Sequence, residues 1–111
     1  MKGLHAFIPA LLLLLSLTSC GTSPQIAYPT VQRLASSGEA SDFDEATLAQ
    51  GRRIFTTRCT ECHVARPVAQ FSAERWRYIV GVMAPRAGLN PADRAAVEAY
   101  LVVARDSLPP G

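Results

Sequence analysis

Apolar residues recur at helical spacing in three stretches of the second half of the chain. In the first stretch, Leu48, Gly51 and Phe55 stand at positions i, i+3 and i+7, which places them on one face of a helix. Asp44 precedes them and can cap the helix by accepting a hydrogen bond from its first turn. The pattern therefore predicts a helix from about Asp44 to about Thr57.

The second stretch follows Ser72, which can also cap a helix. Its apolar residues again share one helical face: Trp76, Ile79, Val80 and Met83. We expect this helix to end near Val82, because Pro85 favours a loop soon afterwards. Met83 would then lie at the start of that loop.

The third stretch has the clearest helix signals. Asn90 can cap it, and Pro91 suits the first helical position. Its apolar stripe consists of Val97, Tyr100, Leu101 and Ala104. The two prolines at 109–110 stop any extension. Since we find no convincing strand pattern and no internal repeat, the sequence predicts an all-α domain of about three helices over residues 44–108.

The N-terminus has a different pattern, in which one early Lys precedes an apolar run over residues 6–17. This run is short for a bilayer span and is typical of a secretory signal; a transmembrane anchor is the weaker alternative. The stretch Leu17–Cys20 resembles a bacterial lipobox. The resemblance implies a signal over residues 1–19, cut before Cys20, and a lipid on the Cys20 thiol. The alternative is a chance Cys in an ordinary signal.

The lipobox resemblance also implies where the protein resides. A lipidated Cys20 would anchor an exported chain to a membrane. Gly21 follows it in place of an Asp, which by resemblance to Gram-negative lipoproteins implies, in such a host, the outer membrane, facing the periplasm. In a single-membrane cell the same anchor would lie on the outside of the plasma membrane. We interpret the Pro-, Ser- and Gly-containing residues 20–43 as the lipidated Cys and a flexible tether. The alternative is an ordered arm in which four residues pack on the domain: Ile26, Tyr28, Val31 and Leu34.

Composition narrows the chemistry of the mature chain. Lys2 is the only lysine among eleven basic residues, so removal of the signal leaves ten Arg against nine Asp and Glu. This near-neutral balance, without a basic patch, argues against a nucleic-acid partner. His63 and Met83 become the sole His and the sole Met after residues 1–19 are removed.

The candidate chemistry lies in the stretch "TTRCTECHVARPV", residues 56–68. Structural zinc usually needs four Cys or His ligands, but only Cys59, Cys62 and His63 are at hand. A redox Cys-x-x-Cys belongs near a βαβ pattern, which is missing, and a plain disulfide would leave His63 unexplained. Cys-x-x-Cys-His is the attachment signature of c-type haem. The motif therefore favours one covalent haem c, with thioethers at both cysteines and His63 as an axial iron ligand.

These features together resemble the short bacterial class I c-type cytochromes over residues 45–105. Gly51 and Phe55 precede Cys59 by eight and four residues, as in the N-terminal helix of that family. That helix crosses the C-terminal helix at an aromatic residue, which Tyr100 would supply. The resemblance implies a cytochrome c-like fold and Met83 as the second axial ligand; core packing is the alternative for Met83.

The resemblance also implies a function. We expect an electron carrier rather than an enzyme, passing single electrons between redox proteins that dock transiently at the haem edge outside the cytoplasm. Contacts to the haem propionates are expected from four residues: Trp76, Arg75, Arg77 and Arg86. One alternative is a haem module with an open sixth coordination site that binds a gas or peroxide. Another is a structural lipoprotein with an incidental cysteine pair, which would carry no haem.

Overall fold

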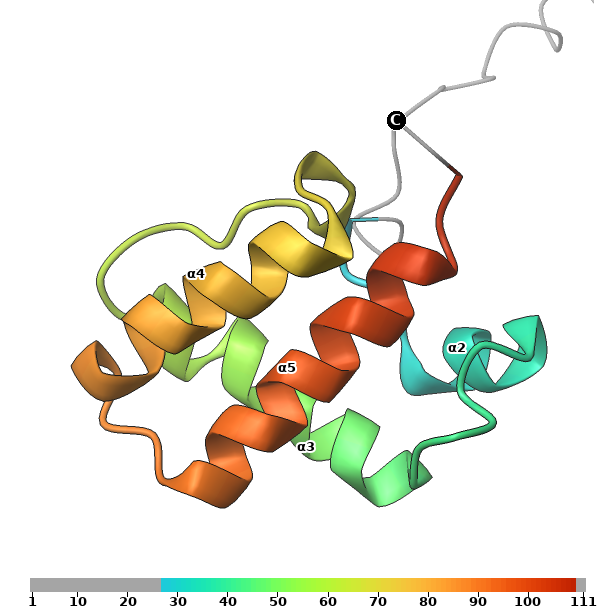
Figure 1. The fold of residues 1–111 in the computed structure, drawn as a ribbon, viewed down its shortest axis with the longest axis horizontal. Helices are drawn as coiled ribbons and strands as arrows, with labels where there is room; N and C mark the ends of the chain where they lie inside the picture. The colour runs from blue at the N-terminus through green and yellow to red at the C-terminus, as the bar shows by residue number, and fades with distance from the viewer. Residues whose placement is uncertain (1–26, 110–111) are drawn as a thin grey trace, which may run out of the picture.

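The computed structural model describes residues 27–109, which fold into α-helices joined by turns and short 3-10 helices (Figure 1). The α-helices are α2 (Val31–Ser37), α3 (Glu45–Thr56), α4 (Ala73–Arg86) and α5 (Pro91–Asp106). Two 3-10 helices, η1 (Arg58–Thr60) and η2 (Val68–Gln70), lie between α3 and α4. No strand occurs within residues 27–109, so the all-α prediction is confirmed for this part of the chain.

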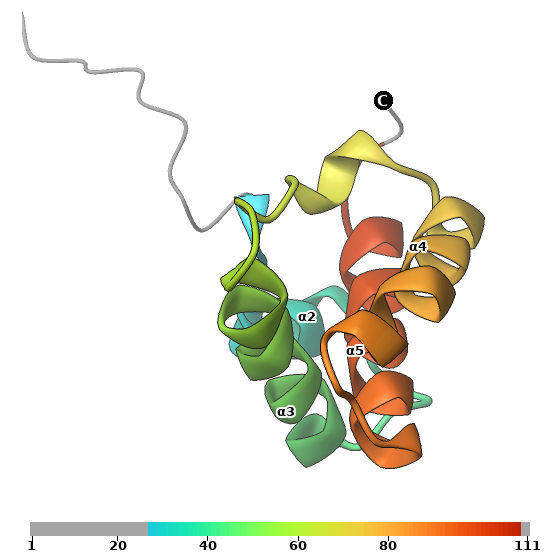
Figure 2. The ribbon, with the colours of Figure 1, turned by 90° about the vertical axis from the view of Figure 1, so that its left-hand side faces the viewer.

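Helix α5 packs against both α3 and α4 and lies between them (Figure 2). The segment over residues 57–72 runs from α3 across one end of the bundle to α4. The stripe predicted on α5 is the centre of the core: Val97, Tyr100, Leu101 and Ala104 are each at most 1% exposed. Asn90 caps α5 by accepting from the backbone N–H of Asp93 at 2.8 Å, as its sequence signals predict.

Gly51 allows α3 and α5 to cross in close contact. A Cβ atom built on Gly51 would lie 2.6 Å from the carbonyl carbon of Ala96 and closer still to its oxygen. The same Cβ would lie 2.8 Å from the Cβ of Tyr100. Because a Cβ atom cannot occupy the space of the Ala96 backbone, only glycine fits this crossing.

Helix α4 continues beyond its predicted end at Val82, so the expectation that Met83 lies in a loop is wrong. Pro85 stands inside the last turn, where it removes one helical hydrogen bond. The helix end is secured by a Schellman motif, in which Gly88 takes a left-handed φ of 61°. In this motif the backbone N–H of Leu89 donates to the carbonyl of Ala84 at 2.9 Å, and that of Gly88 donates to Pro85 at 3.2 Å.

The segment before residue 44 also differs from a flexible tether where the structure describes it. Helix α2 packs on α3, and Leu34 and Val31 are buried. The ordered-arm alternative therefore describes Tyr28, Val31 and Leu34, because their apolar side chains extend the core. Ile26, the signal over residues 1–19 and the lipidation candidate Cys20 lie outside the described residues.

Within residues 27–109, the structure contains no helix that is both long and apolar enough to cross a membrane.

Candidate cofactor site

A cavity of about 420 Å³ opens between the 57–72 segment and helices α4 and α5. This volume lies within the range of small-molecule sites, which are mostly apolar with a few placed polar groups. Its apolar lining comes from Phe55, Ala65, Phe71, Trp76, Ile79, Val80, Met83, Ala84, Ala87, Leu89, Val97 and Leu101. Its other lining residues are Arg58, Cys59, Glu61, Cys62, His63, Arg66 and Arg86.

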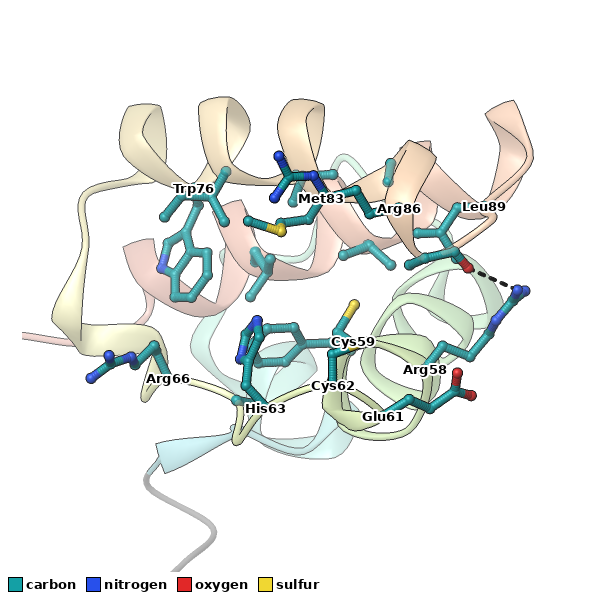
Figure 3. Close-up of a pocket in the computed structure, with 18 of the residues that line it drawn as sticks. Arg58, Cys59, Glu61, Cys62, His63, Arg66, Trp76, Met83, Arg86 and Leu89 are labelled. Carbon is teal, nitrogen blue, oxygen red and sulfur yellow. Dashed lines mark hydrogen bonds between the residues drawn. The ribbon is translucent and has the colours of Figure 1, made fainter.

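The cysteine–histidine motif forms one wall of this cavity. Cys59 lies in η1, directly after α3, and is partly buried, whereas Cys62 and His63 follow in an exposed bend. Both cysteines are free thiols. In Figure 3 the side chains of Cys59 and His63 rise from this wall towards α4. The fold thus brings the three motif residues to one apolar cavity.

Met83 and Trp76 form the opposite wall. Both belong to the inward face of α4, and the sulfur of Met83 points across the cavity towards Cys59 and His63 (Figure 3). Met83 is partly buried, and its carbonyl accepts from the backbone N–H of Ala87 at 2.9 Å. The helix, rather than a loop, therefore fixes the position of this thioether.

The ring of His63 is oriented by its own segment. Its Nδ1 lies 3.0 Å from the carbonyl oxygen of Val64. Because a carbonyl oxygen can only accept, this contact assigns the proton to Nδ1, and the neutral ring keeps its lone pair on Nε2. Metal-binding histidines commonly donate their second nitrogen to a carbonyl in this way.

Burial sets the protonation of the first cysteine. Desolvation raises the pKa of the Cys59 thiol above its usual range; the Arg58 guanidinium opposes this rise and the Glu61 carboxylate adds to it. Cys59 is therefore a neutral thiol at neutral pH.

Arg58 closes one side of the cavity. Its Nη2 donates to the carbonyl oxygens of Ala87 at 2.9 Å and Gly88 at 3.3 Å (Figure 3). These carbonyls belong to the turn after α4, one turn beyond Met83. The residue before Cys59 thus ties the motif wall to the end of the helix that carries Met83.

The remaining charged residues lie on the exposed rim. Arg66 and Arg86 are exposed and line the cavity, as does Glu61 on the motif side. The two guanidinium groups are suited to bind carboxylates at the mouth of the cavity.

Some expected contacts differ in the structure. Arg77 does not line the cavity; it lies 3.8 Å from Glu98 of α5. Arg75 also points elsewhere and stacks 4.9 Å above the ring of Tyr78. Both follow from the 100° step between helical residues, which turns the neighbours of Trp76 outwards. Trp76 does line the cavity, but its indole N–H donates to Val68 at 2.8 Å and is not available for a carboxylate.

Three residues have a role at this site that the sequence does not predict: Arg58, Arg66 and Tyr28. Arg58 directly precedes Cys59 and Arg66 follows His63 by three positions, so their place in the sequence is a usable signal. Tyr28 lies 37 residues from its partner in the cavity wall, and no local pattern could have indicated that contact.

Within residues 27–109, no three His, Cys, Asp or Glu side chains come together in an arrangement that could hold a metal ion. No family model, curated protein or solved structure matches the chain.

Proposed function

We propose that this chain is a membrane-anchored, monohaem c-type cytochrome that transfers single electrons between redox partners outside the cytoplasm. One observation carries the proposal. Two cysteines and a histidine in the order of the haem-attachment motif face a methionine across an apolar cavity of about 420 Å³. Neither zinc binding nor a disulfide accounts for Met83 or for the apolar lining.

The residues present fit a haem by the chemistry of their donors. Cys59 and Cys62 would hold it through thioethers, and His63 would bind iron through the Nε2 lone pair that the Val64 contact leaves free. Met83 would supply a second iron ligand, and Met/His ligation is found in cytochromes c. The rim residues Arg66 and Arg86, in place of the expected Arg77 and Trp76, would pair with the propionates.

When bound, haem c supplies an iron that exchanges one electron between the ferrous and ferric states. The chain would control this exchange through its own side chains. Phe55, Val97 and Leu101 exclude water from the floor of the cavity, where each is at most 4% exposed. The soft thioether of Met83 would favour the reduced iron and raise the reduction potential.

The proposal extends to location and partners. A lipid on Cys20 would anchor the chain, and Cys20 stands seven residues before Ala27, the first described residue. Even a fully extended connection would hold Ala27 within about 25 Å of the anchor. Redox proteins would dock at the exposed motif side, where Val64 is 83% exposed. Such encounters are weak and transient.

Haem content tests the proposal directly. The full chain is expressed with a cytochrome c maturation system, and its mass is measured under denaturing conditions. We expect the mass of one added haem on the wild type and none on the Cys59→Ser/Cys62→Ser double variant, because thioethers survive denaturation. Wild-type protein without haem would contradict the proposal. Covalent haem that binds carbon monoxide readily, with Met83 unligated, would favour the gas- or peroxide-binding alternative.

A further inference from the structure

The arm that precedes α2 contacts the loop that carries His63. The hydroxyl of Tyr28 donates to the carbonyl oxygen of Ala65 at 2.7 Å. The ring of Tyr28 packs edge-to-face on Phe55, with centroids 5.9 Å apart. Both Phe55 and Ala65 line the cavity and are buried. A residue of the N-terminal arm thus supports the cavity wall from behind.

Two successive carbonyl groups of this loop are each held by one side chain. The carbonyl of Val64 accepts from Nδ1 of His63 at 3.0 Å, and the next carbonyl, that of Ala65, accepts from Tyr28. The peptide unit that joins Val64 to Ala65 includes the Val64 carbonyl. Fixing Ala65 therefore restricts the acceptor that orients the histidine ring.

Tyr28 is itself held firmly. The next residue, Pro29, is fully buried, and its carbonyl accepts from the hydroxyl of Tyr100 at 3.0 Å and from Nε of Arg52 at 3.2 Å. Arg52 also donates to the carbonyl of Tyr28 at 3.4 Å. Because side chains of α3 and α5 both hydrogen-bond to the backbone of the arm, the position of the Tyr28 hydroxyl relative to Ala65 is fixed.

We propose that Tyr28 is a positioning residue for His63: its hydrogen bond to Ala65 fixes the Val64 carbonyl that holds the Nδ1–H of the histidine ring. This inference rests on the proposed function, because it concerns His63 as an iron ligand. The hydrogen bond on Nδ1 raises the basicity of a ligating imidazole. Loss of the Tyr28 hydroxyl would loosen that bond, make His63 a weaker donor and favour the reduced iron.

The test uses the haem-loaded full chain and the variant Tyr28→Phe, which keeps the ring against Phe55 and removes only the hydroxyl. The first measurement is the exchange of the His63 Nδ1 proton with solvent, followed by NMR. The second is the redox equilibrium constant against a reference couple. We expect Tyr28→Phe to raise proton exchange by roughly two- to tenfold and to shift the equilibrium towards the reduced form by a similar factor, as expected for one hydrogen bond.

Two control variants separate positioning from general loosening. Tyr78→Phe removes a hydroxyl from a ring that is 61% exposed and should change neither quantity. Tyr100→Phe loosens the arm at Pro29 without touching Ala65, so it should lower stability while changing proton exchange and redox equilibrium less than Tyr28→Phe does.

The outcomes distinguish this inference from the proposed function. Wild-type protein without covalent haem would overturn both. Haem in the wild type and in Tyr28→Phe, with unchanged Nδ1 exchange and redox equilibrium, would overturn the positioning role alone and leave Tyr28 as a packing residue.

Discussion

The two sides of α5 are built in opposite ways. On the α3 side, Gly51 lets the backbones meet, and Leu48 and Tyr100 are fully buried around the crossing. On the other side, a cavity of about 420 Å³ separates α4 from the 57–72 segment, and side chains such as Val80 and Met83 line it. One side leaves no room for a single added methyl group, whereas the other has room for a ligand.

This difference separates the folding scaffold from the site. A close-packed crossing supplies stability through contacts that the chain makes with itself. The cavity side has fewer such contacts and contributes less to stability, in a small domain that can bury little apolar surface. The same apolar lining would stabilise the folded chain once a large apolar group fills it. We therefore expect added atoms to have different effects on the two sides.

The largest effect is expected from Gly51→Ala. Its Cβ would overlap the backbone of Ala96, so the two helices must separate along their crossing. We expect a loss of about 3–5 kcal/mol in the free energy of unfolding, at the upper end of overpacking effects. Denaturant titration followed by circular dichroism measures it.

Gly81→Ala is the matched control for Gly51→Ala. A Cβ on Gly81 would meet only the flexible end of Arg94, at 3.5 Å. Because Ala is the better helix former, this variant should be unchanged or more stable by up to about 1 kcal/mol. Equal losses in both variants would contradict the account of the crossing.

On the cavity side, Val80→Phe should leave the fold intact and reduce haem incorporation. Val80 lines the cavity from α4, so the larger ring would occupy ligand space. We expect unfolding free energy to change by less than about 1.5 kcal/mol. Helical circular dichroism and haem per chain are the measurements. Val82→Phe, on the same helix but 37% exposed and outside the cavity lining, should load haem normally. Full loading of Val80→Phe would mean that haem does not use this cavity.

On the α3 side, a smaller effect on stability is expected from Tyr100→Phe. Losing the hydrogen bond to Pro29 should cost about 1 kcal/mol near neutral pH. Burial raises the pKa of Tyr100 from 10.0 to about 12. The unfolded chain therefore loses its proton first as the pH rises, and wild-type stability should fall by about 2 kcal/mol between pH 10 and 12. The free energy of unfolding, measured across this pH range, should fall less steeply in Tyr100→Phe than in the wild type. An equally steep fall would mean that Tyr100 does not cause the loss of stability.

The smallest effect is expected at the start of α3, far from the cavity. Hydrogen bonds from Thr47, first from its backbone N–H, hold the pKa of Asp44 below its usual 3.8. The charged cap therefore stabilises the fold above that pH, and this stabilisation is lost as the pH falls through the lowered pKa. Asp44→Asn keeps the cap and removes the charge, so its melting temperature should depend less on acid pH. An identical acid profile would contradict the role of the charge.

The sequence predicts the α3 side of α5 better than the cavity side. Helices α3 and α5 follow from caps at Asp44 and Asn90 and from stripes at helical spacing, because local signals and burial agree there. The predicted end of α4 is too early because Pro85, a helix breaker by propensity, outweighs the local stop signal of Gly88 in the sequence pattern. The Schellman hydrogen bonds at Gly88 are local, whereas the Arg58 contacts to the same turn depend on the tertiary fold.

The site shows the same division. The spacing of Cys59, Cys62 and His63 identifies candidate donors, because five consecutive positions encode the motif. Helical spacing places Met83 on the same face as Trp76 and Val80 and turns Arg77 away from that face. That this face lines a cavity opposite the motif depends on how α4 packs in the fold. The Tyr28–Ala65 contact joins residues 37 positions apart through an arm that composition alone suggests to be a tether.

The central claim is that His63 and Met83 bind the iron of one covalent haem from opposite walls of the cavity. The most direct test is the near-infrared absorption of the oxidised, haem-loaded protein, compared between the wild type and Met83→Leu. We predict a methionine-to-iron band in the wild type that disappears in Met83→Leu while the covalent haem remains. A wild-type haem spectrum without this band, or a band that survives in Met83→Leu, would contradict the account.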